Sequence, residues 1–228
     1  MLDKKESDRM IRRVLCYGDS NTWGYVPGIR NRYPENVRWT GVVQQLLGDD
    51  YRILENGLNG RTTVYDDPYF PCRNGLASLD YTLLADAPLD LVVLSLGTND
   101  LKFADARQSA RGAGRLLWEI LSADNRLQTD APIFPHSPKV LLISPIYIHP
   151  NIAEINPETT FHGALPKSVE FSEHFCKLAE QYENVFFLNA AEYAVPSDVD
   201  GVHMNEESHK KLGCAVADRI RDIFSSTT

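Results

Sequence analysis

Five short apolar runs constrain the fold of this chain more than any other feature. They are rich in Val, Ile, Leu and Phe, they are bounded by turn residues, and they cover residues 14–17, 52–54, 89–96, 140–144 and 185–188. Their apolar residues are continuous and do not alternate with polar ones. This pattern is typical of strands that are covered on both faces, as in a parallel sheet.

Helical patterns separate these runs. Apolar residues recur at helical spacing in four stretches, which are residues 39–47, 105–122, 167–182 and 205–224. Gly48 is a stop signal for the first stretch, and Asn205 is a good N-cap for the last. Strands that alternate with helices predict an α/β fold, here a three-layer α/β/α sandwich with a five-stranded parallel sheet.

The length of 228 residues suits one domain, which we place at residues 11–226 after a polar tail at residues 1–10. The net charge of −8 argues against a nucleic-acid binder, because phosphate contacts need clustered Lys and Arg. No apolar run approaches the roughly 18 residues that a membrane span needs, and the first residues lack the apolar core of a secretory signal. We therefore expect a cytoplasmic protein without membrane insertion.

Two segments, residues 65–88 and 146–166, show no clear periodicity. The first holds a cluster of turn residues, and the second holds three prolines and two histidines. Long irregular segments in compact domains are often functional loops. Both follow predicted strands, so we expect them to overhang the same edge of the sheet.

The first apolar run stops at Gly18-Asp19-Ser20. This places one serine at the carboxyl end of a buried strand, where α/β sheets carry their chemistry. A serine hydroxyl becomes a good nucleophile when a base removes its proton. By itself, this block also fits a serine that caps the N-terminus of a helix after a strand.

Asp200 and His203 are the residue types that activate such a serine. Three residues apart in a turn before the last helix, they are able to approach Ser20 together. The imidazole would act as general base and then as general acid, and the carboxylate would orient the ring. Seen alone, this block is also explained as a solvated turn beside a helix.

Two glycine-containing blocks, 57–60 and 97–100, lie between these residues in the sequence. In this order the four blocks resemble those of the SGNH (GDSL-type) esterase and lipase family, over roughly residues 13–223. The resemblance implies a flavodoxin-like serine esterase, and the absence of a G-x-S-x-G elbow argues against the α/β-hydrolase fold. It also implies an oxyanion hole made of the backbone N–H groups of Ser20 and Gly60 and the side chain of Asn99.

The motifs G-D-S-N-T-W-G-Y, G-L-N-G-R-T-T, L-G-T-N-D and D-G-V-H look most like those of the bacterial arylesterase and acyltransferase branch. That likeness implies small esters, acyl transfer as a further activity, and a homo-oligomer. Asn21 departs from the leucine in the family name, and we expect it to take no part in catalysis. Trp23, Tyr25 and Phe161 are candidates for an acyl pocket, although packing in the core or in loops explains them equally well.

The other histidines show no metal-ligand spacing, so we expect no metal site and no cofactor. We expect Asp19 and Asp100 to tie down loops by accepting backbone hydrogen bonds. The sequence therefore predicts a serine esterase that hydrolyses small carboxylic esters through an acyl-enzyme on Ser20. A carbohydrate O-deacetylase with the same residues and a non-catalytic flavodoxin-like binding domain are the alternatives.

Overall fold

The computed structural model describes residues 11–225 and contains the predicted five-stranded parallel sheet. The strand order is β2-β1-β3-β4-β5, and every pair is parallel. The strands are β1 (Arg12–Gly18), β2 (Tyr51–Gly57), β3 (Leu91–Ser95), β4 (Val140–Ser144) and β5 (Val185–Asn189). The polar tail predicted at residues 1–10, and residue 226 of the predicted domain, lie outside the described residues.

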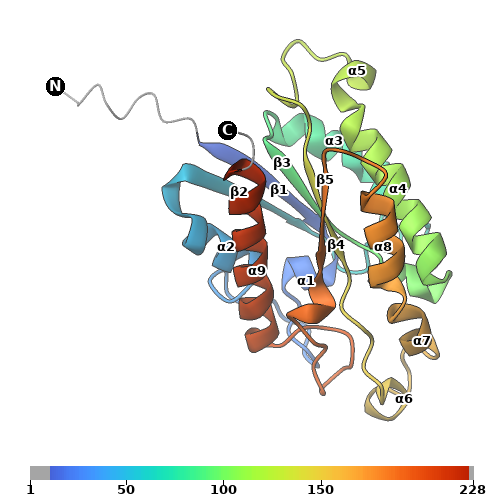
Figure 1. The fold of residues 1–228 in the computed structure, drawn as a ribbon. Helices are drawn as coiled ribbons and strands as arrows, with labels where there is room; N and C mark the ends of the chain where they lie inside the picture. Colours follow the sequence, from blue (N-terminus) through green and yellow to red (C-terminus); the bar gives the residue numbers. More distant parts are fainter. Residues whose placement is uncertain (1–10, 226–228) are drawn as a thin grey trace.

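Helices cover both faces of the sheet, as Figure 1 shows. One face carries α2 (Trp39–Leu47) and α9 (Glu206–Ser225), which pack against each other. The other carries α3 (Gly75–Asp86), α4 (Ala106–Leu121), α5 (Ala123–Leu127) and α8 (Phe171–Ala179). The prediction of an α/β/α sandwich is confirmed.

Two separate hydrophobic cores explain why the strands are continuously apolar. In β1, Val14 and Cys16 face the core beneath α2 and α9, whereas Leu15 and Tyr17 face the core beneath α3, α4 and α8. All four are fully buried. Because successive side chains of a strand point to opposite faces, a sheet between two helical layers needs apolar residues at every position.

The short elements gather at the carboxyl ends of the strands. Figure 1 shows α1 (Ser20–Trp23) in the lower half of the molecule, and α6 (Ile152–Ile155) and α7 (Ala164–Ser168) at its lower end. In the described part of the chain there are three 3₁₀ turns: η1 (Gly48–Asp50), η2 (Thr98–Lys102) and η3 (Ala190–Glu192). No helix within residues 11–225 is both long and apolar enough to cross a membrane.

The helix boundaries correct several predictions. Residues 65–88 are not irregular throughout, because α3 occupies Gly75–Asp86, where Asn74 Oδ1 caps the helix by accepting from the N–H of Leu76 at 3.0 Å. Exposed Tyr81 and Leu84 blur its apolar stripe in the sequence. Likewise, residues 146–166 contain α6 and the start of α7, and the predicted helix 167–182 is divided between α7 and α8.

The observed strand boundaries differ from the predicted ones where polar residues occur. The predicted strand 52–54 is only part of β2, which continues through Glu55 and Asn56. The Glu55 carboxylate accepts hydrogen bonds from Arg32, Arg38 and Thr40. These partners allow the strand to continue through a charged residue at which composition alone predicts its end. The predicted cap of the last helix is confirmed, since Asn205 Oδ1 accepts from the N–H of Ser208 at 2.9 Å.

Candidate active site

The position of Ser20 follows from the tight packing of α1 on the sheet. A Cβ at Gly18 would lie 2.0 Å from Thr22 Oγ1, and one at Gly57 would lie 2.1 Å from the backbone nitrogen of Trp23. Only glycine at both strand ends lets α1 approach this closely. Ser20 is the first residue of α1, just beyond the carboxyl end of β1.

The structure brings Ser20, His203 and Asp200 together in a chain of side-chain hydrogen bonds. Ser20 Oγ lies 2.9 Å from His203 Nε2, and His203 Nδ1 lies 2.7 Å from Asp200 Oδ2. An ionised carboxylate can only accept, so the ring proton lies on Nδ1 and Nε2 is left to accept from the serine hydroxyl. The His203 and Asp200 side chains are 19% and 13% exposed, so the group is within reach of solvent.

The turn at residues 200–203 explains how Asp200 is held. Its Oδ1 accepts from the backbone N–H groups of Val202 at 3.1 Å and His203 at 2.9 Å. Gly201 has a φ of 73°, in the left-handed region that favours glycine. Burial raises the pKa of Asp200, but the hydrogen bonds from His203 and from the turn outweigh it and hold this pKa below its usual value.

Asn21 links the serine block directly to the histidine turn. Its Oδ1 accepts from the N–H of Met204 at 2.9 Å, and its Nδ2 donates to the carbonyl oxygen of Val202 at 3.4 Å. These two bonds bracket His203 in the sequence. The Asn21 amide thus connects the neighbours of His203 to the residue after Ser20, and the expectation that Asn21 takes no part in catalysis stays a prediction.

The three predicted pocket residues lie in different surroundings. The ring of Tyr25 lies against the His203 imidazole, with 4.4 Å between centroids and 31° between planes. Trp23 is half-buried, and the guanidinium of Arg32 lies over its ring. Phe161 is buried in the core beneath α3, α4 and α8. Tyr25 thus contacts the predicted base, and an acyl-pocket role for all three remains a prediction.

The proposed oxyanion donors sit on neighbouring strand ends. Gly18 pairs in register with Gly57 of β2 and Ser95 of β3, which places the loops with Gly60 and Asn99 on either side of the serine block. Within residues 11–225, neither the N–H of Ser20 nor that of Gly60 donates to another group. Free, fixed donors of this kind are what a developing oxyanion requires.

Asn99 is oriented by the block that contains Gly60. Its Nδ2 donates to the carbonyl oxygen of Arg61 at 3.1 Å, and both groups are buried. A side-chain amide has two N–H groups, so this bond leaves one of them available. The arrangement fixes the Asn99 amide relative to Gly60 before any substrate arrives.

Asp100 and Asp19 tie these loops together, as predicted. Asp100 Oδ1 accepts from the N–H of Thr63 at 2.8 Å, and its Oδ2 accepts from the hydroxyls of Thr63 at 2.6 Å and Ser109 at 2.7 Å. Asp19 Oδ1 accepts from the N–H of Asn21 at 2.9 Å. Burial raises the pKa of each carboxyl to about 6, even though these hydrogen bonds lower it.

Arg61 is a part of the site that sequence reasoning missed. Its Nη1 donates to the carbonyl oxygens of Gly18 at 2.9 Å and Asn56 at 2.6 Å, and its guanidinium lies 4.0 Å from the centroid of the Tyr17 ring. A buried arginine thus joins the Gly60 loop to the strand that ends at Ser20. The only sequence signal for this role of Arg61 is its position directly after the glycine block.

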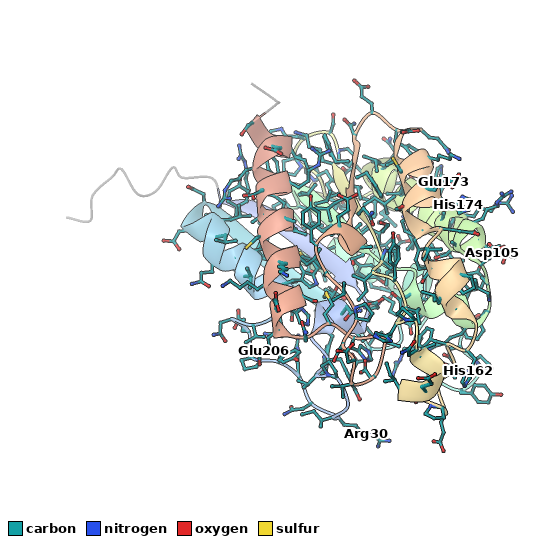
Figure 2. All side chains as sticks on the ribbon, turned by 60° about the horizontal axis from the view of Figure 1, so that its bottom comes forward. Arg30, Asp105, His162, Glu173, His174 and Glu206 are labelled. Atoms are coloured by element: carbon teal, nitrogen blue, oxygen red, sulfur yellow. The ribbon has the colours of Figure 1, made fainter. Side chains whose placement is uncertain are left out.

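The other histidines were also considered as metal ligands. His174 on α8 and His162 between α6 and α7 lie apart in Figure 2. Within the described part of the chain, no group of three or more histidine, cysteine or acidic residues is arranged to hold a metal ion.

Comparisons with known proteins agree with this arrangement. The model of the GDSL-like Lipase/Acylhydrolase family matches residues 16–211. Est24, a carbohydrate acetylesterase from Sinorhizobium meliloti, is 36% identical over 93% of this chain and 99% of its own, with a TM-score of 0.85. The native aryl esterase of M. smegmatis is also 36% identical over 93% and 99%, with a TM-score of 0.83. A search of curated proteins finds no match.

The fold and the match define a hydrolase of the α/β/α type with a G-D-S serine block. The chain belongs to the GDSL-like lipase/acylhydrolase family, and it is a carboxylic ester hydrolase that acts on small-molecule esters.

Proposed function

We propose that this enzyme hydrolyses small carboxylic esters through a covalent acyl-enzyme on Ser20, with His203 as the base and Asp200 as its partner. The observation that carries this proposal is the pair of distances from Ser20 Oγ to His203 Nε2, 2.9 Å, and from His203 Nδ1 to Asp200 Oδ2, 2.7 Å. This order of hydrogen bonds is the one that serine activation needs.

In the first half of the reaction, Ser20 Oγ attacks the ester carbonyl carbon while its proton passes to His203 Nε2. The carbonyl π electrons move to oxygen, and the N–H groups of Ser20 and Gly60, with the Asn99 amide, stabilise that negative charge. When the tetrahedral intermediate collapses, the bond to the alcohol oxygen breaks and His203 returns the proton to the alcohol. The acyl group then remains on Ser20.

In the second half, water takes the place of the alcohol. His203 accepts a proton from water, the resulting hydroxide adds to the acyl carbon, and collapse releases the carboxylic acid and restores the Ser20 hydroxyl. An alcohol in place of water would give acyl transfer by the same steps. The cycle uses only water and groups of this chain.

A carbohydrate O-deacetylase is the second candidate. It is favoured by the likeness to Est24, a carbohydrate acetylesterase, but the aryl esterase of M. smegmatis is equally identical in sequence. Both candidates use the same three residues, so they differ only in the substrate. A cytoplasmic location, a homo-oligomer and a single domain at residues 11–226 also stay predictions.

A panel of esters tests the proposal. Purified wild type and Ser20→Ala would be compared on phenyl acetate, para-nitrophenyl esters of increasing chain length, and acetylated xylose. We expect the wild type to prefer short aryl esters and Ser20→Ala to be inactive on all of them. A preference for acetylated xylose of tenfold or more would favour the deacetylase, and equal rates for the two proteins would contradict the proposal.

A further inference from the structure

Arg73 lies against the glycine of the proposed oxyanion hole. A Cβ built on Gly60 would be 3.4 Å from both Cδ and Nε of Arg73. The backbone of Arg73 is fixed to the same loop, since its carbonyl oxygen accepts from the N–H of Thr62 at 2.9 Å and from the Thr62 hydroxyl at 3.2 Å. The backbone of Arg73 is thus fixed to the Gly60 loop, and its side chain passes beside Gly60.

The guanidinium of Arg73 lacks a carboxylate partner. Within residues 11–225 its one acceptor is the carbonyl oxygen of Pro71, at 3.2 Å, and no carboxylate oxygen lies within 4.0 Å of it. Arg38 and Arg126, which are also partly buried, both form ion pairs. A guanidinium has five N–H donors, so most of those of Arg73 are available to a ligand.

A second cation, Arg61, belongs to the same loop as Gly60. Arg61 is buried, and its guanidinium bonds to oxygens of Gly18 and Asn56, none of them a carboxylate. Arg61 follows Gly60 directly in the chain, and the side chain of Arg73 lies beside Gly60, so both cations flank the same loop. Burial lowers the pKa of Arg61, the charges of Tyr17 and Asp19 raise it, and the positive charge of Arg73 lowers it. The chain has a net charge of −8, so a local pair of cations is what an anionic substrate would need to approach it.

We propose that Arg73 forms an anion subsite beside the oxyanion hole and selects esters that carry a carboxylate close to the scissile carbonyl. This inference rests on the proposed function, because it places the substrate carbonyl between Ser20 and Gly60. A guanidinium matches the geometry of a carboxylate with two parallel N–H bonds. Arg73 flanks Gly60 itself, so the carboxylate of the substrate belongs either to its acyl group or to its alcohol group. The ester pairs below distinguish the two.

Matched ester pairs test the subsite and separate the two sides. On the acyl side, mono(para-nitrophenyl) adipate is compared with para-nitrophenyl hexanoate. On the alcohol side, meta-acetoxybenzoate is compared with meta-acetoxybenzamide. For each pair the ratio of kcat/KM, anionic over neutral, is measured for wild type, Arg73→Gln and Arg73→Lys.

We expect Arg73→Gln to lower this ratio by about tenfold or more for at least one pair, the usual scale for losing a hydrogen bond to a charged group. Arg73→Lys should give an intermediate ratio, because it keeps the charge and loses the planar fork. Arg52→Gln is the control. It removes the same charge from an exposed residue near the start of β2, at the opposite end of the sheet, and should leave both ratios at the wild-type value.

A ratio for Arg73→Gln within twofold of wild type for both pairs would overturn the subsite while Ser20-dependent hydrolysis continued. Activity in Ser20→Ala would overturn the proposed function instead. If Arg73→Gln fails to fold, the wild type alone decides the question. Added salt should then lower its kcat/KM for the anionic member of a pair more than for the neutral one, and equal sensitivity would contradict the subsite.

Discussion

The two halves of the candidate site are held in different ways. The half with the proposed base consists of Asp200 and His203, partly exposed side chains in the turn before α9, which are hydrogen-bonded in series to the buried Ser20. The half with the oxyanion donors is fixed by buried groups beneath it, chiefly Asp100 with three hydrogen bonds and Arg61 with bonds to two strand ends.

This difference matches what each half has to do. The base must exchange protons with substrate and water, so it needs access to solvent and an acceptor nitrogen. The oxyanion donors must be in place before charge develops, so they need a rigid support. We therefore expect substitutions in the first half to remove activity with little change in stability, and substitutions beneath the second half to change stability as well.

The largest effect separates His203 from Asp200. We expect His203→Ala to lower kcat on the order of 10⁵- to 10⁶-fold, and Asp200→Asn to lower it about 10⁴-fold, because the carboxylate helps the base and is not itself the proton acceptor. Wild-type kcat/KM should fall at acid pH, since only a neutral imidazole accepts the serine proton. Steady-state rates across pH check this. An equal or larger loss in Asp200→Asn, with no fall at acid pH, would remove His203 from the role of base.

The next largest effect concerns the oxyanion half. Asn99→Ala should lower kcat about 10²- to 10³-fold, the cost of removing one donor to the oxyanion. The KM should change little if the Asn99 amide acts mainly on the transition state. An effect confined to KM would mean that Asn99 binds the ester in its ground state. The second half of the site would then not act through Asn99 on the oxyanion.

Asp100→Asn tests the buried support through stability. Burial raises the pKa of Asp100 from its ordinary value of 3.8 to about 6. The folded state therefore holds this proton more tightly than the unfolded state, and this stabilisation, present below pH 4, is lost as pH rises through about 6. Asn cannot ionise, so the variant should gain stability relative to wild type between pH 4 and 7, on the order of 1 to 3 kcal/mol.

Urea unfolding of both proteins across that range checks this prediction. A wild-type to variant difference that is independent of pH would contradict an ionisable, buried Asp100. The matched variant Asp130→Asn, which removes a carboxyl group from an exposed residue, is measured beside it as the control.

The smallest effect lies at the link between the serine block and the histidine turn. Asn21→Leu removes the acceptor for the Met204 N–H and the donor to Val202, and should lower kcat up to about tenfold, as expected for neutral hydrogen bonds. Circular dichroism should show an unchanged fold. A variant with wild-type kcat would mean that the Asp200 turn holds His203 without the help of Asn21.

Sequence reasoning predicted the sheet and the meeting of Ser20, Asp200 and His203, because strand-end blocks in a parallel sheet must converge at one edge. It missed α3, since Tyr81 and Leu84 face solvent and obscure the apolar stripe of that helix. It also missed the link from Asn21 to the histidine turn and the role of Arg61. Their roles depend on contacts with residues far away in the sequence or with backbone oxygens, which no local pattern reveals.

The most direct test of the account is covalent labelling with a fluorophosphonate ester, which reacts with an activated serine. We expect one adduct per chain by intact mass, on the peptide that contains Ser20, and no adduct in Ser20→Ala. His203→Ala should be labelled far more slowly, because its serine lacks a base. An adduct on a different residue, or equal labelling of wild type and Ser20→Ala, would contradict the assignment of Ser20 as the nucleophile.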